Sequence, residues 1–271
     1  MKKKQKPELT KQEQFVKNHK RHHHQVSVMR TFIFLVFLVL WEVSASVGWI
    51  DSFFFSSPSR VILCFLDQLK TNSLLMHIGV TLYETIISFL LVIFFSLLTA
   101  TLLWCSNRLS EVLEPYLVIL NSLPKSALAP LFIVWLGTGT TTIIVAGISV
   151  AIFGSIISFY TGFRQVDSEK ITLIYTLGGK KSDAFFKVVL PGSVPILLST
   201  AKVNIGLALV GVIIGEFLAA RRGLGYLIIY GSQVFRLDMV ITSIIVLCVI
   251  ALIFYKSIQF VEHRIKIKFK Q

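Results

Sequence analysis

Ionisable side chains stand inside several long apolar stretches of this sequence. Lys125 directly follows Pro124, whereas Lys202 and Glu216 lie near opposite ends of a later apolar run. A charged group at membrane depth costs free energy, so it usually faces a bundle interior or a water-filled pathway. Lys125, Lys202 and Glu216 are therefore candidates for lining a translocation path. Pro124 is a fourth candidate, because a helix break at membrane depth is tolerated only where protein covers it or where it lines a wet cavity. The alternative is that the two lysines snorkel to the interface or pair with a carboxylate such as Glu84 or Glu216.

A second group of candidate residues lies in the basic stretch TLGGKKSDAFFKVVLP, residues 176–191. Phe185, Val188 and Val189 fall at helical spacing and share one apolar face. A short helix with such a face needs a cover to be stable. The cover can be the inner ends of the chain's own spans, the lipid headgroup layer or a groove on a partner protein. Composition leaves all three open.

Part of the same stretch, GGKKS at 178–182, superficially resembles a phosphate-binding loop. The pattern GxxxxGK[ST] is not satisfied, because Lys181 stands where a Ser or Thr is needed. We therefore expect no ATP binding or hydrolysis by this chain, and we predict that it is not an enzyme. No catalytic residue and no cofactor-binding residue are predicted.

Metal sites are also not predicted. The three cysteines show no CxxC spacing, which excludes the usual zinc and disulfide patterns. His19 and the run 22–24 could bind a metal ion, but no Cys or carboxylate cluster completes a site there. A basic cytoplasmic tail that contacts anionic lipid headgroups is the favoured interpretation of residues 1–30.

The composition defines the class of protein that must position these residues. The chain has 271 residues, of which 54% are hydrophobic and only 15% charged, and its mean hydropathy is +0.75. A soluble domain would carry about 25% charged residues. The formal charge of +13 comes from Lys and Arg gathered at the ends of apolar runs, which is the pattern of a polytopic membrane protein. No nucleic-acid partner is expected.

Apolar runs of the length that crosses a bilayer, about 20 residues, number five, and a sixth is interrupted by two prolines. They are 31–50, 78–104, 141–163, 197–219 and 241–261, with 112–136 as the interrupted one. Counting all six places the basic ends 1–30 and 262–271 on the same side as the basic loop 164–195, in agreement with the positive-inside rule. We predict an all-α membrane protein with six transmembrane helices and cytoplasmic N- and C-termini.

The loop 164–195 is predicted to form two short helices. The first covers about 168–177, with Asp167 or Ser168 as N-cap and Gly178-Gly179 as its end. The second begins near Ser182 and stops before Pro191, because the residue before a proline resists helical geometry.

This loop resembles the signature loop of ABC importer permeases, whose pattern is EAA, three residues, Gly, nine residues and Ile-x-Leu-Pro. Gly178 matches the glycine, Val188 the isoleucine, and Leu190-Pro191 the ending, at the same spacing. The EAA element is absent, since residues 172–174 read TLI. The stretches 113–139 and 214–228 are similar to the subfamily that imports nitrate, sulfonates, taurine and similar solutes. Members that import pyrimidine precursors of thiamine are the alternative.

The resemblance implies a type I ABC importer-like permease in a bacterial-type inner membrane, with a core over 77–261 that follows a first transmembrane helix at 31–50. It implies a partner ATP-binding subunit in the cytoplasm, an extracytoplasmic solute-binding protein and a second permease copy, expected as a homodimer. The loop would transmit ATP-driven motion to the bundle. Its coupling residues, carried over by position, are Gly178, Gly179, Phe185, Phe186, Val189, Leu190 and Pro191.

Two hypotheses from other classes remain beside this one. A self-contained channel or secondary transporter would work without ATP, and such transporters often show inverted internal repeats, which we do not find. A membrane-embedded enzyme would need converging His, Cys or carboxylate groups at bilayer depth, where this sequence has only scattered single charges.

Overall fold

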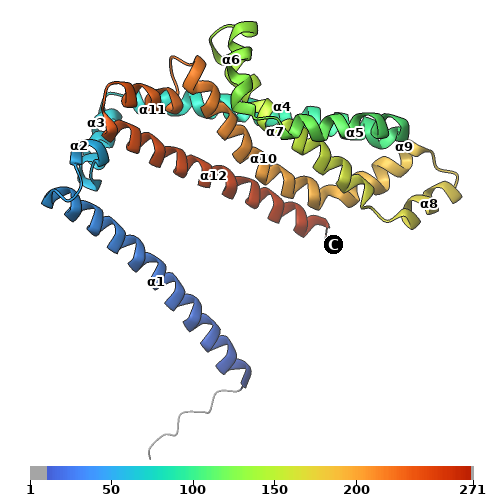
Figure 1. The fold of residues 1–271 in the computed structure, drawn as a ribbon. Coiled ribbons are helices and arrows are strands. Elements are labelled where there is room, and N and C mark those ends of the chain that lie inside the picture. Colours follow the sequence, from blue (N-terminus) through green and yellow to red (C-terminus); the bar gives the residue numbers. More distant parts are fainter. Residues whose placement is uncertain (1–10, 270–271) are drawn as a thin grey trace, which may run out of the picture. The chain divides into compact units, whose positions relative to one another are not determined.

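A computed structural model describes residues 11–269 of the chain, which is built from helices joined by short turns (Figure 1). No strand occurs in these residues, so the all-α prediction is confirmed. The chain divides into two compact units, residues 1–63 and 64–271. Each unit is described by itself below.

The first unit contains α1 (Lys11–Val47), α2 (Ser52–Phe55) and the first turns of α3 (Pro58–Lys70). α1 is continuous, so residues 11–30 belong to the same helix as the predicted span rather than to a separate tail. The first ten residues of the predicted tail lie outside the described part. The apolar portion of α1, Gln25–Val47, is long enough to cross a membrane.

The start of α3 is held by a carboxylate from α1. Glu42 accepts hydrogen bonds from the backbone amide of Ser59 at 3.0 Å and from its hydroxyl at 2.8 Å. The first amides of a helix have no partner within the helix, and Glu42 supplies one. This explains an acidic side chain in the apolar portion of α1.

The second unit holds the end of α3 and every later helix. These are α4 (Ser73–Cys105), α5 (Asn107–Ser122), α6 (Lys125–Leu136), α7 (Thr140–Arg164), α8 (Ser168–Thr176), α9 (Lys181–Ala184), a π-helical turn η1 (Phe185–Val189), α10 (Leu190–Ala219), α11 (Leu224–Gln233) and α12 (Leu237–Phe269). Helices α4, α7, α10 and α12 run alongside one another, with α8 and α9 at one end and α11 at the other (Figure 1). The predicted tail 262–271 is the helical end of α12, apart from its last two residues, which lie outside the described part.

Helix α7 packs between α4 and α10, and small residues let the backbones approach closely. A Cβ atom placed on Gly211 would lie 2.8 Å from the Ala146 carbonyl oxygen. Across the other contact, the hydroxyls of Ser88 and Ser96 donate to the carbonyls of Ile144 and Ile152, at 3.2 and 3.3 Å. Small residues and such interhelical bonds are typical of helix pairs in membranes, where apolar surface alone gives little drive for association.

Five of the predicted spans correspond to continuous helical segments that are long and apolar enough to cross a membrane. The interrupted sixth does not form a straight helix. α5 and α6 are bent by 95° at the break around Leu123 and Pro124. Residues 11–269 therefore contain five candidate spans, and six if the bent pair is one span.

The close contact at Gly211 gives a stability test. Gly211→Ala should lower the free energy of unfolding by roughly 1–3 kcal/mol, the usual cost of overpacking. The unfolding temperature of the purified protein in detergent should fall accordingly. Gly206→Ala is the matched control, because nothing lies within 4 Å of a Cβ atom placed there. That variant should be neutral or stabilising by up to about 1 kcal/mol, since alanine is the better helix former. Equal effects of the two substitutions would contradict this packing.

Candidate functional site

The first loop helix forms as predicted. The Asp167 side chain accepts from the Glu169 amide at 2.9 Å and caps the start of α8. Gly178 has a φ of +80°, a conformation that L side chains rarely adopt, and α8 ends just before it. The Gly179 amide then donates to the Ile174 carbonyl at 2.9 Å. Glycine is the usual residue at such a helix end.

The second loop helix differs from the prediction. It begins at Lys181, but it does not stop before Pro191 and runs on as α10 to Ala219. The reason is the π-turn η1, in which the Leu190 amide bonds to the Phe185 carbonyl five residues back. This wider turn accommodates a proline, which lacks an amide hydrogen and would clash with the preceding turn of a regular helix.

The two adjacent phenylalanines of the loop differ in burial, although their rings contact each other with centroids 5.3 Å apart. Phe185 is 5% exposed and packs against the rings of Trp104 and Phe163, with ring centroids 5.2 and 5.4 Å away. Phe186 is 66% exposed. Of the three possible covers for the apolar face, the structure shows the first, the ends of the chain's own helices.

Exposed apolar side chains remain on the loop. Besides Phe186 they are Leu173, Tyr175 and Leu177 on and just after α8. The loop is also tied to the end of α4, because the Lys181 ammonium donates to the Cys105 carbonyl at 2.9 Å. Among the other residues predicted for coupling, Gly178 is exposed, Val189 is buried, and Gly179, Leu190 and Pro191 are partly buried.

The lysine in the bent helix pair is bonded to backbone carbonyls. The Lys125 ammonium donates to the carbonyl oxygens of Leu120 and Asn121, at 2.8 and 2.5 Å. These carbonyls lie at the end of α5, where Pro124 and the bend remove the usual amide donors. Lys125 therefore provides hydrogen-bond donors for carbonyl oxygens that the break at Pro124 leaves without amide partners.

The other intramembrane lysine is paired with a carboxylate that the sequence argument did not consider. Lys202 on α10 lies 2.5 Å from Glu262 on α12. Pairing with a carboxylate is therefore confirmed for Lys202, but the partner is Glu262 and not the suggested Glu84 or Glu216, and Lys125 bonds to backbone carbonyls instead. Pairing across two helices depends on how the helices are rotated, which the positions of charges in a sequence do not give.

Glu216 lies at the opposite end of the unit from the loop, at the centre of a buried polar cluster. It is 1% exposed and accepts from the Thr81 hydroxyl at 2.7 Å and from the Gly225 amide at 2.5 Å. The Thr81 oxygen accepts in turn from the Leu224 amide, and His77 Nδ1 accepts from the Gly223 amide. Thr81 and His77 were missed by sequence reasoning, because no local pattern links them to residues more than 140 positions away.

The cluster holds the turn between α10 and α11. Gly223 has a φ of +115°, and a Cβ atom there would collide with the Glu216 carboxyl group. The first amides of α11 thus bond to Thr81 and Glu216 instead of to water. A carboxylate at a helix N-terminus is also favoured by the helix dipole.

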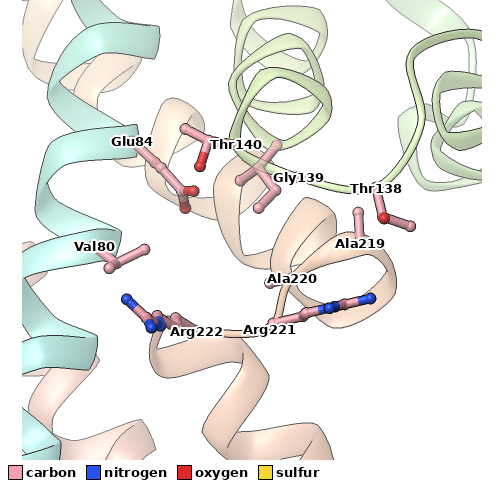
Figure 2. Close-up of a pocket in the computed structure, with 10 residues that line it drawn as sticks. Val80, Glu84, Thr138, Gly139, Thr140, Ala219, Ala220, Arg221 and Arg222 are labelled. Atoms are coloured by element: carbon pink, nitrogen blue, oxygen red, sulfur yellow. The ribbon is translucent and has the colours of Figure 1, made fainter.

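Beside this cluster is an open hollow of about 550 Å³. Three segments line it: α4 with Val80 and Glu84, the turn into α7 with residues 138–140, and the end of α10 with residues 219–222 (Figure 2). Of the predicted path residues, Glu216 lies next to Glu84 beside this hollow. Lys125 and Lys202 do not line it.

Comparison with known proteins identifies the family. Residues 92–267 match the family described as "Binding-protein-dependent transport system inner membrane component". The chain belongs to this family. It is therefore an inner-membrane transport component, in agreement with the resemblance of the loop, and the predicted ABC importer permease class is confirmed.

Curated relatives of this permease cover most of its length. It is 32% identical over 231 residues to a "Probable ABC transporter permease protein" of Haemophilus influenzae, covering 84% of this chain and 93% of the relative. It is 28% identical to the "Formylaminopyrimidine transport permease protein ThiX" of Halalkalibacterium halodurans, covering 72% and 78%. It is 26% identical to the "Putative aliphatic sulfonates transport permease protein SsuC" of Bacillus subtilis, covering 85% and 83%.

The fold of the permease also occurs among solved structures. The inward-facing MetNI methionine ABC transporter matches with a TM-score of 0.61 at 19% identity, covering 73% of this chain and 96% of that chain. This similarity shows a shared fold, the type I importer fold predicted from the sequence.

The different burial of the two phenylalanines predicts different effects on the free energy of unfolding. Phe185→Ala should lower the free energy of unfolding by about 3–5 kcal/mol, the usual loss for a buried Phe. Phe186→Ala, the matched control, should change it by less than about 0.5 kcal/mol, because its ring is exposed. Thermal unfolding of both purified variants in detergent measures the difference, and similar shifts would refute the assignment.

Proposed function

We propose that this permease imports a small polar or anionic organic solute of the sulfonate, nitrate or taurine type, driven by ATP hydrolysis in a separate subunit. The observation that carries the proposal is the family match over residues 92–267, which includes the whole loop. A relative is named for aliphatic sulfonate transport. Import of a thiamine pyrimidine precursor is the alternative, favoured by the relative named for formylaminopyrimidine transport.

Partner proteins follow from the family in general terms, since its description names a binding-protein-dependent system. For this chain we propose a cytoplasmic ATP-binding subunit at the loop, a solute-binding protein at the opposite end of the bundle and a second permease copy. A homodimer is the simplest arrangement.

Coupling to the ATP-binding subunit is proposed to use the exposed side of the loop. Phe186 offers an aromatic anchor of the kind that commonly dominates interface energy. Gly178 and Gly179 fix the angle between α8 and α9. The buried residues Phe185 and Val189 contribute indirectly, because they tie the loop to α4 and α7.

The path through the membrane is proposed to pass the bend between α5 and α6. A helix break at membrane depth is tolerated where it is covered by protein or lines a cavity, and Pro124 with Lys125 forms such a break. Lys202 and Glu216 remain proposed path residues. Their bonds to Glu262 and Thr81 support an indirect contribution, through the positions of α10 and α12 relative to α4.

The proposed coupling surface is tested with Phe186→Asp. The variant should retain its unfolding temperature. The amount of ATP-binding subunit that copurifies with it should fall at least about tenfold, because a charge replaces the aromatic anchor. Solute-stimulated ATP hydrolysis by the reconstituted complex should fall in parallel. Phe235→Asp is the matched control, since Phe235 is 62% exposed and follows α11 at the other end of the unit.

Full ATPase copurification with the Phe186→Asp variant would exclude the proposed anchor. Uptake by the purified permease alone, without ATP or an ATP-binding subunit, would instead favour a channel or a secondary transporter.

A further inference from the structure

Two carboxyl groups from different helices meet at the end of the unit opposite the loop. Glu84 of α4 and Glu216 of α10 are each 1% exposed, and their side chains are in hydrogen-bond contact. An ionised carboxylate can only accept hydrogen bonds, whereas a protonated carboxyl group also donates one. The contact therefore requires a proton on one of the two groups. Two negative charges in such contact would instead repel each other.

The neighbours of Glu216 keep it as the acceptor in this contact. Its Oε1 atom accepts from the Thr81 hydroxyl at 2.7 Å, and its Oε2 atom accepts from the Gly225 amide at 2.5 Å. An amide can only donate. The Thr81 oxygen accepts from the Leu224 amide, which leaves its hydrogen available for Glu216. Both oxygens of Glu216 thus face fixed donors, and a proton on either of them would displace a hydrogen bond.

Glu84 has the complementary environment. The Thr140 hydroxyl bonds to it, and within residues 11–269 no hydrogen-bond donor is directed at its Oε2 atom. An oxygen that carries a proton needs an acceptor rather than a donor. Glu84 is therefore the donor in the contact, and the ionised Glu216 is the acceptor.

In the described part of the chain, no cation is paired with either of these carboxyl groups. The ionisable groups around them are His77 on α4, Arg221 and Arg222 on the turn after α10, and Tyr226 on α11. His77 accepts from the Gly223 amide at Nδ1, so this nitrogen carries no proton. The start of α7, like α6 and α12, places no ionisable residue in the hollow beside the pair. A proton on Glu84 therefore does what a neighbouring cation does at other buried carboxylates.

We propose that Glu84 and Glu216 form a proton-binding site that ties α4 to α10, in which Glu84 is protonated at neutral pH and donates its proton to Glu216. The proton can exchange with water, because Glu84 lines the open hollow (Figure 2). Loss of the proton at alkaline pH leaves two carboxylates in contact inside the unit, and like charges repel. This repulsion separates α4 from the turn between α10 and α11. It also frees the amides that Glu216 and Thr81 hold at the start of α11.

Infrared spectroscopy of the purified permease in nanodiscs tests where the proton lies. At neutral pH the spectrum should contain the carbonyl stretch of a protonated, buried carboxyl group, which an ionised carboxylate lacks. Glu84→Gln should remove this band without lowering the unfolding temperature, because the glutamine amide still donates to Glu216. Glu111→Gln is the matched control and should retain the band, since Glu111 is exposed on α5 at the other end of the unit.

Hydrogen exchange tests the contact between the helices. The amides of Leu224 and Gly225 bond to Thr81 and Glu216, so their exchange rates report on local opening of the cluster. After correction for the intrinsic effect of pH, these rates should rise by at least about tenfold between neutral and alkaline pH. The unfolding temperature should fall over the same range, because the folded state holds a proton that the unfolded chain has released. Both changes should be absent in Glu84→Gln, which has no proton to lose at this position.

Three results would overturn the inference. One is a spectrum without the band of a protonated carboxyl group at neutral pH. Another is a band that survives in Glu84→Gln, which would place the proton on a different residue. The third is an alkaline rise in exchange that is equal in Glu84→Gln and in the unmodified permease. None of these measurements involves transport, so a failure of the proton site is distinguishable from a failure of the proposed import function, which absence of ATP-driven uptake would show.

Discussion

Backbone amides and carbonyls at membrane depth have no water to bond with, so every interruption of a helix must be satisfied by the protein itself. Three interruptions of helices in this chain are satisfied by its own groups. At the bend between α5 and α6, the Lys125 ammonium donates hydrogen bonds to the carbonyls at the end of α5. At the start of α11, Glu216 and Thr81 accept from the first amides. At Pro191, a π-turn shifts the bonding pattern by one residue. Charged and polar residues that look functional in the sequence, such as Lys125 and Glu216, thus form the hydrogen bonds that interrupted helices would otherwise lack.

The same constraint links the loop to the bundle. Phe185 is buried between Trp104 at the end of α4 and Phe163 near the end of α7, and the loop helix continues without a stop into α10. A force applied to the exposed face of the loop would therefore reach three helices of the bundle directly. Helix α7 packs against α4 and α10 through small residues, so a displacement at one end is transmitted along rigid helices rather than absorbed by side chains.

At the far end, the turn between α10 and α11 is fixed by the cluster around Glu216, and the hollow lies against this cluster. The arginines on its open side belong to that turn, whereas Glu84 belongs to α4. A relative movement of α4 and α10 would change the distance between Glu84 and these arginines. Such a difference in contacts between two states is what a ligand needs in order to bias an equilibrium between conformations.

The sequence alone determined the apolar spans, the first loop helix with its Gly178 end, and the family-like spacing of Gly178, Val188 and Leu190-Pro191, because these depend on local periodicity and on backbone preferences of single residues. The tertiary structure alone decided which phenylalanine is buried, that Lys202 pairs with Glu262, and that Thr81 reaches Glu216 across 135 positions. It also placed Glu84 and Arg222 along the same hollow. The physical reason is that burial and pairing depend on the rotation and approach of helices distant in sequence. That geometry is fixed by packing at residues such as Gly211 and not by the charges themselves.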